Sequence, residues 1–309
     1  MSSFATVYAF NKLTENKFRQ ALNNVQYLYL AEIFPFFEEN ANKLLFETLY
    51  CTNICKKLKW KDIKNFDAKT LDELQLNAKY MTNNLQLGQA IDLGTYINKP
   101  LLYKTELKEL TSEIFKFHEK FCSQAQKTIQ EAKKGLQMPV DAIIGIHGRF
   151  TDYKGHLSTM GLKLIGPKFY EKAINFFEEK YKNPLFLLVS DHPPKAIKAI
   201  SKNGQNLPQN VKFVGTIKEV LDGKIEKYES TGYDLALLAA CDHVVISHGT
   251  FGIWASFLSS LENTHIMAHN LMVEKDNIPN KNGRNSDRPQ EVKAMKEAKF
   301  ENYLFMDDQ

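Results

Sequence analysis

The stretch that decides the fold of this 309-residue chain is residues 143–153, with the sequence IIGIHGRFTDY. It begins as a short apolar run rich in β-branched residues and ends in polar and charged side chains. Such a run predicts a buried strand of an α/β sheet. Its charged end then falls at the carboxyl edge, where open α/β sheets bind their ligands. Arg149 offers a planar fork of donors that matches phosphate. The alternative is a surface loop in which Arg149 only pairs with Asp152.

Apolar runs and helical segments alternate after Pro139, which extends the pattern of the opening stretch. We expect strands at 142–147, 185–189, 211–214, 244–247 and 264–268. We expect helices at 169–181, 196–200, 233–240 and 253–261. A strand–helix alternation of this kind predicts an α/β fold with a doubly wound parallel sheet.

The first part of the chain is richer in helical patterns. We expect helices at 5–13 and 38–60, and the clearest one at 106–136, where apolar residues recur at threes and fours until Gly135 and Pro139 end it. The expected domains are therefore a helix-rich domain at 1–138 and a Rossmann-like domain at 139–269. Residues 270–309 are expected to be a polar, loose tail that closes with a short apolar piece at 303–306.

The composition is that of a globular protein and excludes several classes. Hydrophobic residues make up 43% and charged residues 25% of the chain, which is ordinary for a soluble domain. A formal net charge of +4 is too small and too evenly spread to indicate nucleic-acid binding, but it suits a small anionic ligand. No run reaches the roughly 18 apolar residues that span a bilayer, and no secretory signal is present. The four cysteines lack the spacing of a zinc site.

Three of the predicted strands end in polar residues. The first ends in His147, Arg149 and Asp152, the second in residues 190–192, and another in residues 247–250. Because the carboxyl ends of parallel strands share one edge of the sheet, these groups are expected to converge on one crevice.

The stretch 249–252 is a Gly-Thr-Phe-Gly turn that leads into a predicted helix. Gly249 and Gly252 allow the backbone to approach a ligand closely, and the N-terminus of a helix presents free N–H groups to a phosphate. Arg149 opposite this helix start would complete a pyrophosphate clamp. In the alternative interpretation, Thr250 is only an N-cap and the glycines only form the turn.

Several known catalytic patterns are absent from the sequence. There is no Gly-x-x-x-x-Gly-Lys-Ser/Thr phosphate loop and no Gly-x-Ser-x-Gly elbow. No Asp-x-Asp is present either, which argues against a metal ion that bridges a pyrophosphate. We therefore expect no metal and no cofactor, with protein cations and the helix dipole taking the charge of a leaving group.

These residues resemble those of a known family. Residues 144–153 resemble the His-x-Arg-Arg-x-Asp-Tyr motif of the α-1,2-fucosyltransferases, glycosyltransferase family 11. Residues 234–258 look like the last motif of that family almost position by position, and 186–191 are similar to its middle motif. The resemblance covers roughly residues 4–268. It implies a GT-B-like fold with two Rossmann-like domains. It also implies inverting, metal-independent transfer of fucose from GDP-fucose to the 2-hydroxyl of a terminal β-galactoside on a glycan.

The resemblance also implies roles for individual residues. Arg149 would hold the pyrophosphate, with His147 lining the same site, and Asp152 would orient the arginine or contact the nucleotide. Asp191 would lie near the guanosine or the sugar. The general base stays open between Asp152 and Glu32. Phosphate would be bound by the turn that comprises Gly249, Thr250, Phe251 and Gly252.

The sequence departs from the family pattern at two places. Phe150 stands where the family has a second arginine, which removes one cation from the donor site. The glycine-rich loop and the membrane anchor that precede the first helix in the family are not part of this chain. The resemblance implies the Golgi lumen, with membrane contact only through such an anchor. The alternatives are a truncated first domain, or a degenerate relative that binds a nucleotide or glycan without catalysis.

Overall fold

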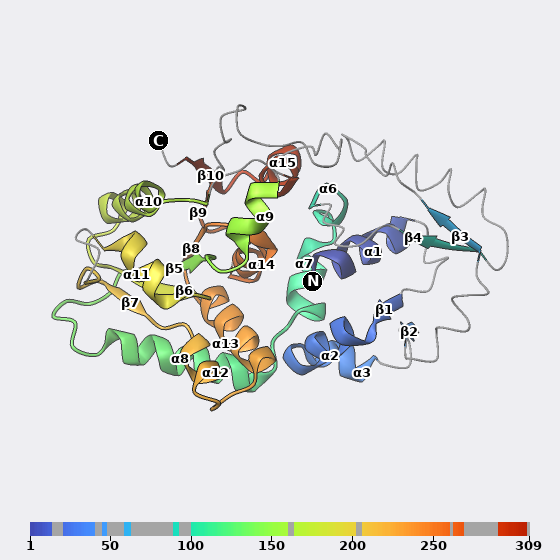
Figure 1. Cartoon of the computed structure of the whole chain (residues 1–309), viewed down its shortest axis with the longest axis horizontal. Helices are drawn as coiled ribbons and strands as arrows, with labels where there is room; N and C mark the ends of the chain where they lie inside the picture. The colour runs from blue at the N-terminus through green and yellow to red at the C-terminus, as the bar shows by residue number, and fades with distance from the viewer. Residues whose placement is uncertain are drawn as a thin grey trace. The chain divides into compact units, whose positions relative to one another are not determined.

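The computed structural model describes residues 1–13, 21–40, 45–47, 59–62, 89–92, 100–159, 164–201, 206–259, 262–268 and 290–307. Its contacts divide the chain into two compact units (Figure 1). The first unit comprises residues 1–118 and 294–299, and the second comprises residues 119–293 and 300–309. No helix in the described ranges is both long enough and apolar enough to cross a membrane.

The second unit is built on a six-stranded parallel sheet with the order β10-β9-β8-β5-β6-β7. Its strands are β5 (Ala142–Gly148), β6 (Pro184–Ser190), β7 (Val211–Phe213), β8 (His243–Ile246), β9 (His265–Ala268) and β10 (Tyr303–Met306). Counted along the chain, this order runs outward in both directions from β5 and β8, as in a doubly wound nucleotide-binding fold. The sheet confirms the expected α/β class and the doubly wound sheet of a GT-B-like fold.

The strand order reverses between β5 and β8, which pair with His147 opposite Ile246. Ligands of open α/β sheets bind at such a switch point, outside the carboxyl ends of the strands. Residues 143–153 form most of β5, the loop after it and the first residue of α9, so the Arg149 loop lies at this point of the fold.

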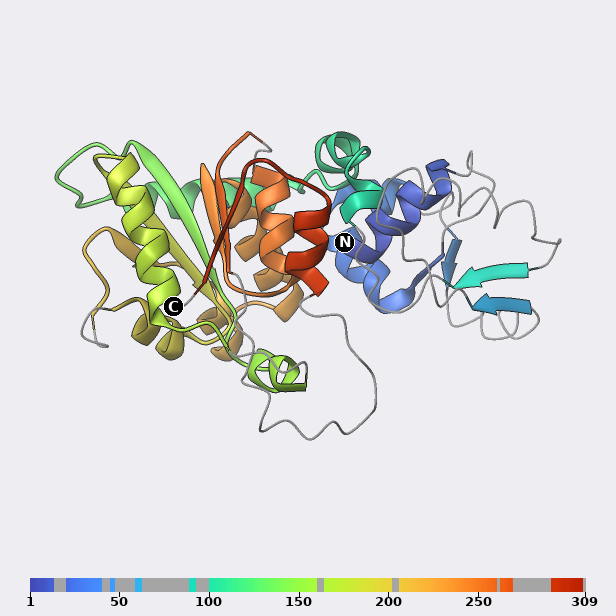
Figure 2. The same cartoon turned by 90° about the horizontal axis from the view of Figure 1, so that it is seen from above.

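Helices cover both faces of the sheet (Figure 2). The helices of the second unit are α8 (Glu119–Lys133), α9 (Tyr153–Thr159), α10 (Pro167–Lys180), α11 (Pro193–Ile200), α12 (Ile217–Leu221), α13 (Lys227–Ala239) and α14 (Gly249–Ser259). Helix α15 (Gln290–Glu297) is divided between the two units after residue 293. Aromatic residues of α10, such as Phe169 and Phe177, pack on Ile144 and Phe186 of the central strands. On the opposite face, a Cβ atom on Gly145 would lie 2.8 Å from Leu238 of α13, so strand and helix are in close contact there.

The first unit has an aromatic core in its described residues. Its elements are α1 (Ser2–Leu13), β1 (Ala21–Asn23), α2 (Asn24–Ile33), α3 (Pro35–Glu39), β2 (Leu45–Glu47), β3 (Lys59–Asp62), β4 (Gln89–Asp92), α6 (Pro100–Tyr103), α7 (Leu107–Glu109) and a π-helix, η1 (Leu110–Ile114). Strands β1 and β2 pair in parallel, as do β3 and β4. Phe4 meets the rings of Phe37 and Phe115 edge to face. The helix expected at 38–60 is wrong at 45–47 and at 59–60, which belong to strands β2 and β3, and residues 41–44 and 48–58 lie outside the described ranges.

The single helix expected at 106–136 is wrong, because the chain leaves the helical path after Ile114 and α8 begins only at Glu119. Phe115 is fully buried among the aromatic rings of the first unit, and the N–H of His118 donates to the carbonyl oxygen of Ile33. The helical spacing is real, but the two halves of the apolar stripe pack in different units, and this tertiary packing overrides the local pattern.

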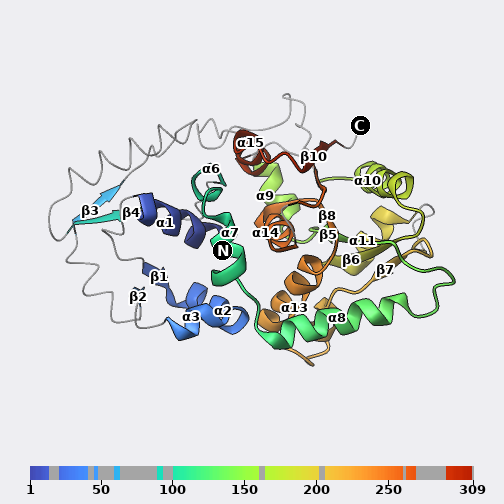
Figure 3. The same cartoon turned by 180° about the vertical axis from the view of Figure 1, so that it is seen from behind.

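Helix α8 lies beside α13 (Figures 1 and 3). A Cβ atom on Gly232 of α13 would lie only 2.4 Å from the ring of Phe121, and Phe121 meets the ring of Tyr233 edge to face. The compact second unit therefore begins at residue 119. This is about twenty residues before the boundary at 138/139 that the onset of strand–helix alternation predicted.

The loose tail expected at 270–309 is wrong for the residues that the structure describes there. Residues 303–306 form β10, the sixth strand of the sheet, and the Tyr303 hydroxyl lies 2.5 Å from the Ser256 hydroxyl of α14. The strand is short and sits at the edge of the sheet, so its sequence carries a weak signal. Residues 269–289 lie outside the described ranges.

Candidate functional site

The carboxyl ends of β5 and β8 are tied to each other by hydrogen bonds. The backbone N–H of Arg149 donates to the Ser247 hydroxyl over 3.1 Å, and the N–H of Ser247 donates to the carbonyl oxygen of His147 over 3.2 Å. The loop after β5 also reaches Asp191 at the end of β6. The structure therefore brings together the three polar strand ends that the sequence singled out.

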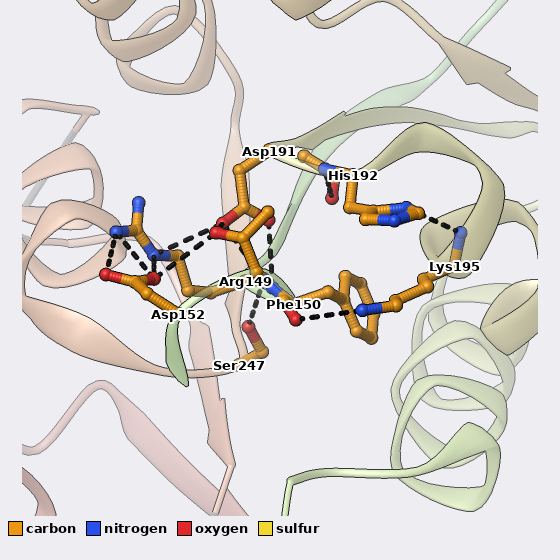
Figure 4. A network of polar contacts seen from close by, with 9 residues as sticks. Arg149, Phe150, Asp152, Asp191, His192, Lys195 and Ser247 are labelled. Atoms are coloured by element: carbon orange, nitrogen blue, oxygen red, sulfur yellow. Dashed lines mark hydrogen bonds and ion pairs between the residues drawn. The ribbon is translucent and has the colours of Figure 1, made fainter. Parts of the chain in front are cut away.

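The Arg149 guanidinium lies between two carboxylates (Figure 4). Its Nε and Nη2 atoms each donate to an oxygen of Asp152 over 3.1 Å, and Nε lies 3.3 Å from Oδ2 of Asp191. The guanidinium carbon also lies 5.7 Å from the ring centre of Tyr153. The ion pair with Asp152 that we considered as an alternative is present, and the contact with Asp191 adds to it. Arg149 keeps 36% of its side chain exposed, so the group is open to a ligand.

Asp191 shapes the loop that carries the arginine. Its Oδ1 accepts the backbone N–H of Phe150 over 2.8 Å, and its Oδ2 accepts both the N–H and the hydroxyl of Thr151, over 3.3 Å and 2.5 Å. Both carboxylate oxygens of Asp191 therefore contact the loop, and Oδ2 also contacts the Arg149 guanidinium. The expected contact of Asp191 with the guanosine or sugar stays a prediction.

Asp152 is the more exposed of the two carboxylates, with 66% of its side chain accessible. Partial burial alone would raise the pKa of Asp152, but the hydrogen bonds and charge of Arg149 hold that pKa below its usual value. A carboxylate with a lowered pKa is a weak base. Asp152 is thus suited to pairing with Arg149 and poorly suited to taking a proton. The other candidate base, Glu32, lies on α2 of the first unit and stays a prediction.

His147 is a buried, neutral imidazole at the end of β5. Burial, together with the charge of Arg149, lowers the pKa of His147 to about 4. Only 5% of His147 is exposed, and its Nδ1 atom has no hydrogen-bond partner among the residues that the structure describes. Buried polar atoms are usually satisfied, and this nitrogen instead faces the first turn of α14, where a Cβ atom on Gly252 would lie 2.9 Å from it.

Helix α14 begins at this edge and approaches β5 and β8 closely. Gly249 has φ +81°, and a Cβ atom there would lie 2.9 Å from the Tyr153 hydroxyl oxygen. A Cβ atom on Gly252 would lie 2.7 Å from Ile246 and 2.9 Å from Nδ1 of His147. The glycines therefore let the first turn of the helix lie directly against the strand ends.

The start of α14 differs from the sequence expectation. The helix was expected to begin at residue 253 after a turn, but residues 249–252 already form its first turn. Thr250 stands inside this turn, so the alternative in which it is only an N-cap is wrong. Thr250 and Phe251 are half-buried, and the Phe251 ring lies 5.2 Å from the His147 ring. The arrangement places the N-terminal end of an eleven-residue helix beside Arg149 and His147.

Phe150 points away from this edge into the hydrophobic core. Only 4% of the residue is exposed, and its ring lies 6.2 Å from the ring of Tyr170. Its carbonyl oxygen accepts a hydrogen bond over 3.4 Å from the ammonium of Lys195, an exposed residue in the first turn of α11. Sequence reasoning missed Lys195, whose only signal was its place after the polar end of β6.

A buried acid to which sequence reasoning assigned no role lies on α13. Asp234 is 8% exposed, and its Oδ1 accepts the N–H and the hydroxyl of Thr216, over 2.9 Å and 2.8 Å. Burial raises the pKa of Asp234 to about 7, although the bonds from Thr216 oppose this shift. The sequence signal for such a residue is an acid inside the otherwise apolar helical run at 233–240.

Among the residues that the structure describes, no three His, Cys, Asp or Glu side chains are grouped as metal ligands would be.

Comparison with known proteins places these features in a family. The model of the family described as "Glycosyl transferase family 11" matches residues 4–282. The galactoside 2-α-L-fucosyltransferase Sec1 of Mus musculus is 29% identical over 153 residues, 49% of this chain and 38% of the relative. The corresponding protein of Bos taurus is 28% identical over 173 residues, 56% of this chain and 43% of the relative. These matches therefore span less than half of either relative's length.

Solved structures were compared as well. A crystal structure of the α-1,6-fucosyltransferase NodZ co-crystallised with GDP has a TM-score of 0.44 and 15% identity, over 82% of this chain and 86% of that chain. A structure of NodZ from Bradyrhizobium gives the same score and identity. The match of the family model over most of the sequence is decisive, and by it the chain belongs to glycosyl transferase family 11.

Proposed function

We propose that this chain transfers L-fucose from GDP-fucose to the 2-hydroxyl of a terminal β-galactoside. One observation carries the proposal: the partly exposed Arg149 guanidinium lies at the switch point of the sheet, next to the N-terminal turn of α14 and to His147, whose Nδ1 has no hydrogen-bond partner among the described residues. This is the position in which open α/β sheets bind nucleotides. Family membership supports the class of reaction, and the names of the Sec1 relatives support the donor sugar and the acceptor position.

The donor would be bound through its diphosphate. Arg149 can donate two parallel hydrogen bonds to one phosphate, and the backbone N–H groups in the first turn of α14 carry the positive end of the helix dipole. The neutral imidazole of His147 can give or accept one further hydrogen bond without adding charge. Residues Gly249, Thr250, Phe251 and Gly252 would therefore act mainly through their backbone.

The reaction breaks the bond between C1 of fucose and the β-phosphate oxygen, and GDP leaves with that electron pair. The 2-hydroxyl oxygen of the galactoside forms the new bond from the opposite face, which inverts the configuration at C1, and its proton passes to a base. Negative charge grows on the departing phosphate, so Arg149 and the α14 dipole would stabilise the transition state more than the ground state. In this proposal these protein charges act without a metal. Asp152 is a poor candidate for the base because of its lowered pKa, and Glu32 stays a candidate. The Golgi lumen stays the proposed location, on the family resemblance alone.

A second candidate function is nucleotide or glycan binding without catalysis. It is favoured by Phe150, which is buried in the core and contributes no cation to the strand ends. With fewer positive charges near the diphosphate, less of the growing negative charge would be stabilised, and transfer would be slow while binding persists.

The two functions are separated by measuring GDP release from GDP-fucose with a β-galactoside acceptor, in buffer that contains EDTA. Calorimetric titration with GDP is performed on the same protein. Turnover with EDTA present supports the transferase, and turnover that ends with EDTA contradicts the metal-independent mechanism. GDP binding without turnover supports the second candidate. A chain that binds no GDP and releases none would contradict both.

A further inference from the structure

Two carboxylates flank the Arg149 guanidinium, and their surroundings differ. The side chain of Asp191 is 18% exposed, and it also holds the backbone N–H groups of Phe150 and Thr151. The side chain of Asp152 is 66% exposed and bonds to Arg149 and, over 3.3 Å, to the Thr151 hydroxyl. The same hydroxyl lies closer to Asp191, at 2.5 Å. Asp191 is therefore built into the loop, whereas Asp152 lies on its surface.

We infer that Asp191 is a positioning residue that holds Arg149 in place for the phosphate, and that Asp152 is an exchangeable counter-ion that the phosphate displaces. This inference rests on the proposed function and assigns Asp191 a role other than direct contact with the nucleotide. Oδ2 of Asp191 lies 3.3 Å from Nε of Arg149, the same atom that donates to Asp152. When the phosphate displaces Asp152 from Nε and Nη2, Asp191 keeps its ion pair at Nε, and the two terminal nitrogens become available for a bidentate contact with phosphate oxygens.

Thr151 also helps to hold the loop that carries Arg149. Its hydroxyl and its N–H both donate to Oδ2 of Asp191, next to the contact with Nε of Arg149. The arginine is thus fixed from two directions, by the loop backbone and by its own side chain. Pre-ordering of this kind strengthens ligand binding because less conformational freedom is lost when the ligand binds.

Simple electrostatics predicts a different outcome. Both carboxylates are negative charges close to the place of an anionic ligand, so removing either charge should strengthen the binding of GDP. If Asp191 positions the arginine, its removal must instead weaken binding. The sign of the effect at Asp191 therefore separates a positioning role from a general charge effect.

The experiment is a calorimetric titration with GDP of the full chain and of two isosteric variants, Asp191→Asn and Asp152→Asn. Both remove one negative charge beside the same guanidinium, so each is the matched control of the other. In Asp191→Asn, an amide N–H₂ replaces one oxygen and can accept none of the donors of Thr151 and Arg149. We expect GDP binding to weaken by about tenfold or more, because this is the cost of losing one charge-assisted hydrogen bond between Arg149 and the phosphate. In Asp152→Asn, we expect GDP binding to stay unchanged or to tighten.

Thr151→Val provides a second variant that leaves all charges in place. It removes the hydroxyl that donates to Asp191, so GDP binding should weaken, and Thr151→Ser, which keeps the hydroxyl, should restore it. Hydrogen exchange reports on the loop without any ligand. Exchange at residues 149–152 should accelerate in Asp191→Asn and stay unchanged in Asp152→Asn, at similar melting temperatures.

A double-mutant cycle with Arg149→Ala separates positioning from direct contact. If Asp191 acts through the arginine, Asp191→Asn weakens binding no further in the Arg149→Ala background. Full additivity, or GDP binding that Asp191→Asn leaves equal or tighter, would overturn the inference while leaving the proposed function intact. Absence of GDP binding by the unmodified chain would overturn the proposed function itself, and the exchange measurement would still show whether Asp191 holds the loop.

Discussion

The contact between α14 and the two central strands can be tested by adding one methyl group at Gly252. In Gly252→Ala the new Cβ atom would lie 2.7 Å from Cγ2 of Ile246 and 2.9 Å from Nδ1 of His147. Non-bonded carbon atoms prefer about 3.5–4.0 Å, so the first turn of the helix must move outward by roughly 1 Å. Both strand residues are buried, and neither offers a flexible end that could give way.

The expected cost follows from this geometry. An added methyl group in a packed core costs about 1–3 kcal/mol, which lowers the melting temperature of a domain of this size by roughly 2–12 °C at 2–4 °C per kcal/mol. The N–H groups that would hold the phosphate move with the helix, so GDP should bind about tenfold to a hundredfold more weakly, as expected when a charge-assisted hydrogen bond is lost. Thermal unfolding and calorimetric titration with GDP measure the two effects.

Gly155→Ala is the matched control, since nothing lies within 4 Å of a Cβ atom at this position of α9. Its stability should stay equal or rise by up to about 1 kcal/mol, because alanine favours the helix more than glycine does. Equal melting temperatures and GDP affinities in the two variants would refute the close contact at Gly252. A lower melting temperature with normal GDP affinity would show that the N-terminus of α14 does not hold the phosphate.

Three further predictions address the arginine, a buried acid and the last strand. Arg149→Ala should weaken GDP binding about tenfold to a hundredfold, since a charge-assisted hydrogen bond contributes about 1.5–3 kcal/mol. Its melting temperature should stay nearly unchanged because exposed ion pairs contribute about 0–1 kcal/mol, and an unfolded variant would instead make Arg149 structural. The raised pKa of Asp234, about 7, means that the folded state holds its proton more tightly, so stability should fall as the pH rises from about 4 to 7. Melting scans of Asp234→Asn should lack this fall, and an identical pH profile would contradict the raised pKa. Tyr303→Phe removes the buried hydroxyl that meets Ser256 and should lower the free energy of unfolding in urea by about 1–2 kcal/mol, whereas no change would show that this hydroxyl contact does not stabilise the fold.

Local pattern alone was enough to predict much of the second unit. Apolar runs of four to seven residues between helical segments can be stable only as buried strands of a covered parallel sheet. Because such strands point the same way, their polar ends had to gather at one edge. The convergence of Arg149, Asp191 and Ser247 follows from that rule, and so does its place at the switch point.

Only the tertiary structure decided where the helix at 106–136 is interrupted and that residues 303–306 form a strand. The stripe at 106–136 has helical spacing throughout, but Phe115 packs with the aromatic rings of the first unit and Phe121 with Tyr233 in the second. The short run at 303–306 became a strand only because β9 offers it an open edge.

At the candidate site, too, some features follow from the sequence pattern and others only from the tertiary structure. The sequence determined that Arg149 and Asp191 follow neighbouring strands, and that a glycine-bounded turn follows β8. Only the folded chain decided that Asp191 bonds to the loop of Arg149 and that Phe150 turns inward. It also decided that Nδ1 of His147 is buried without a partner in the part of the chain that the structure describes. Side-chain direction depends on which neighbours pack at that position, and those neighbours come from distant parts of the chain.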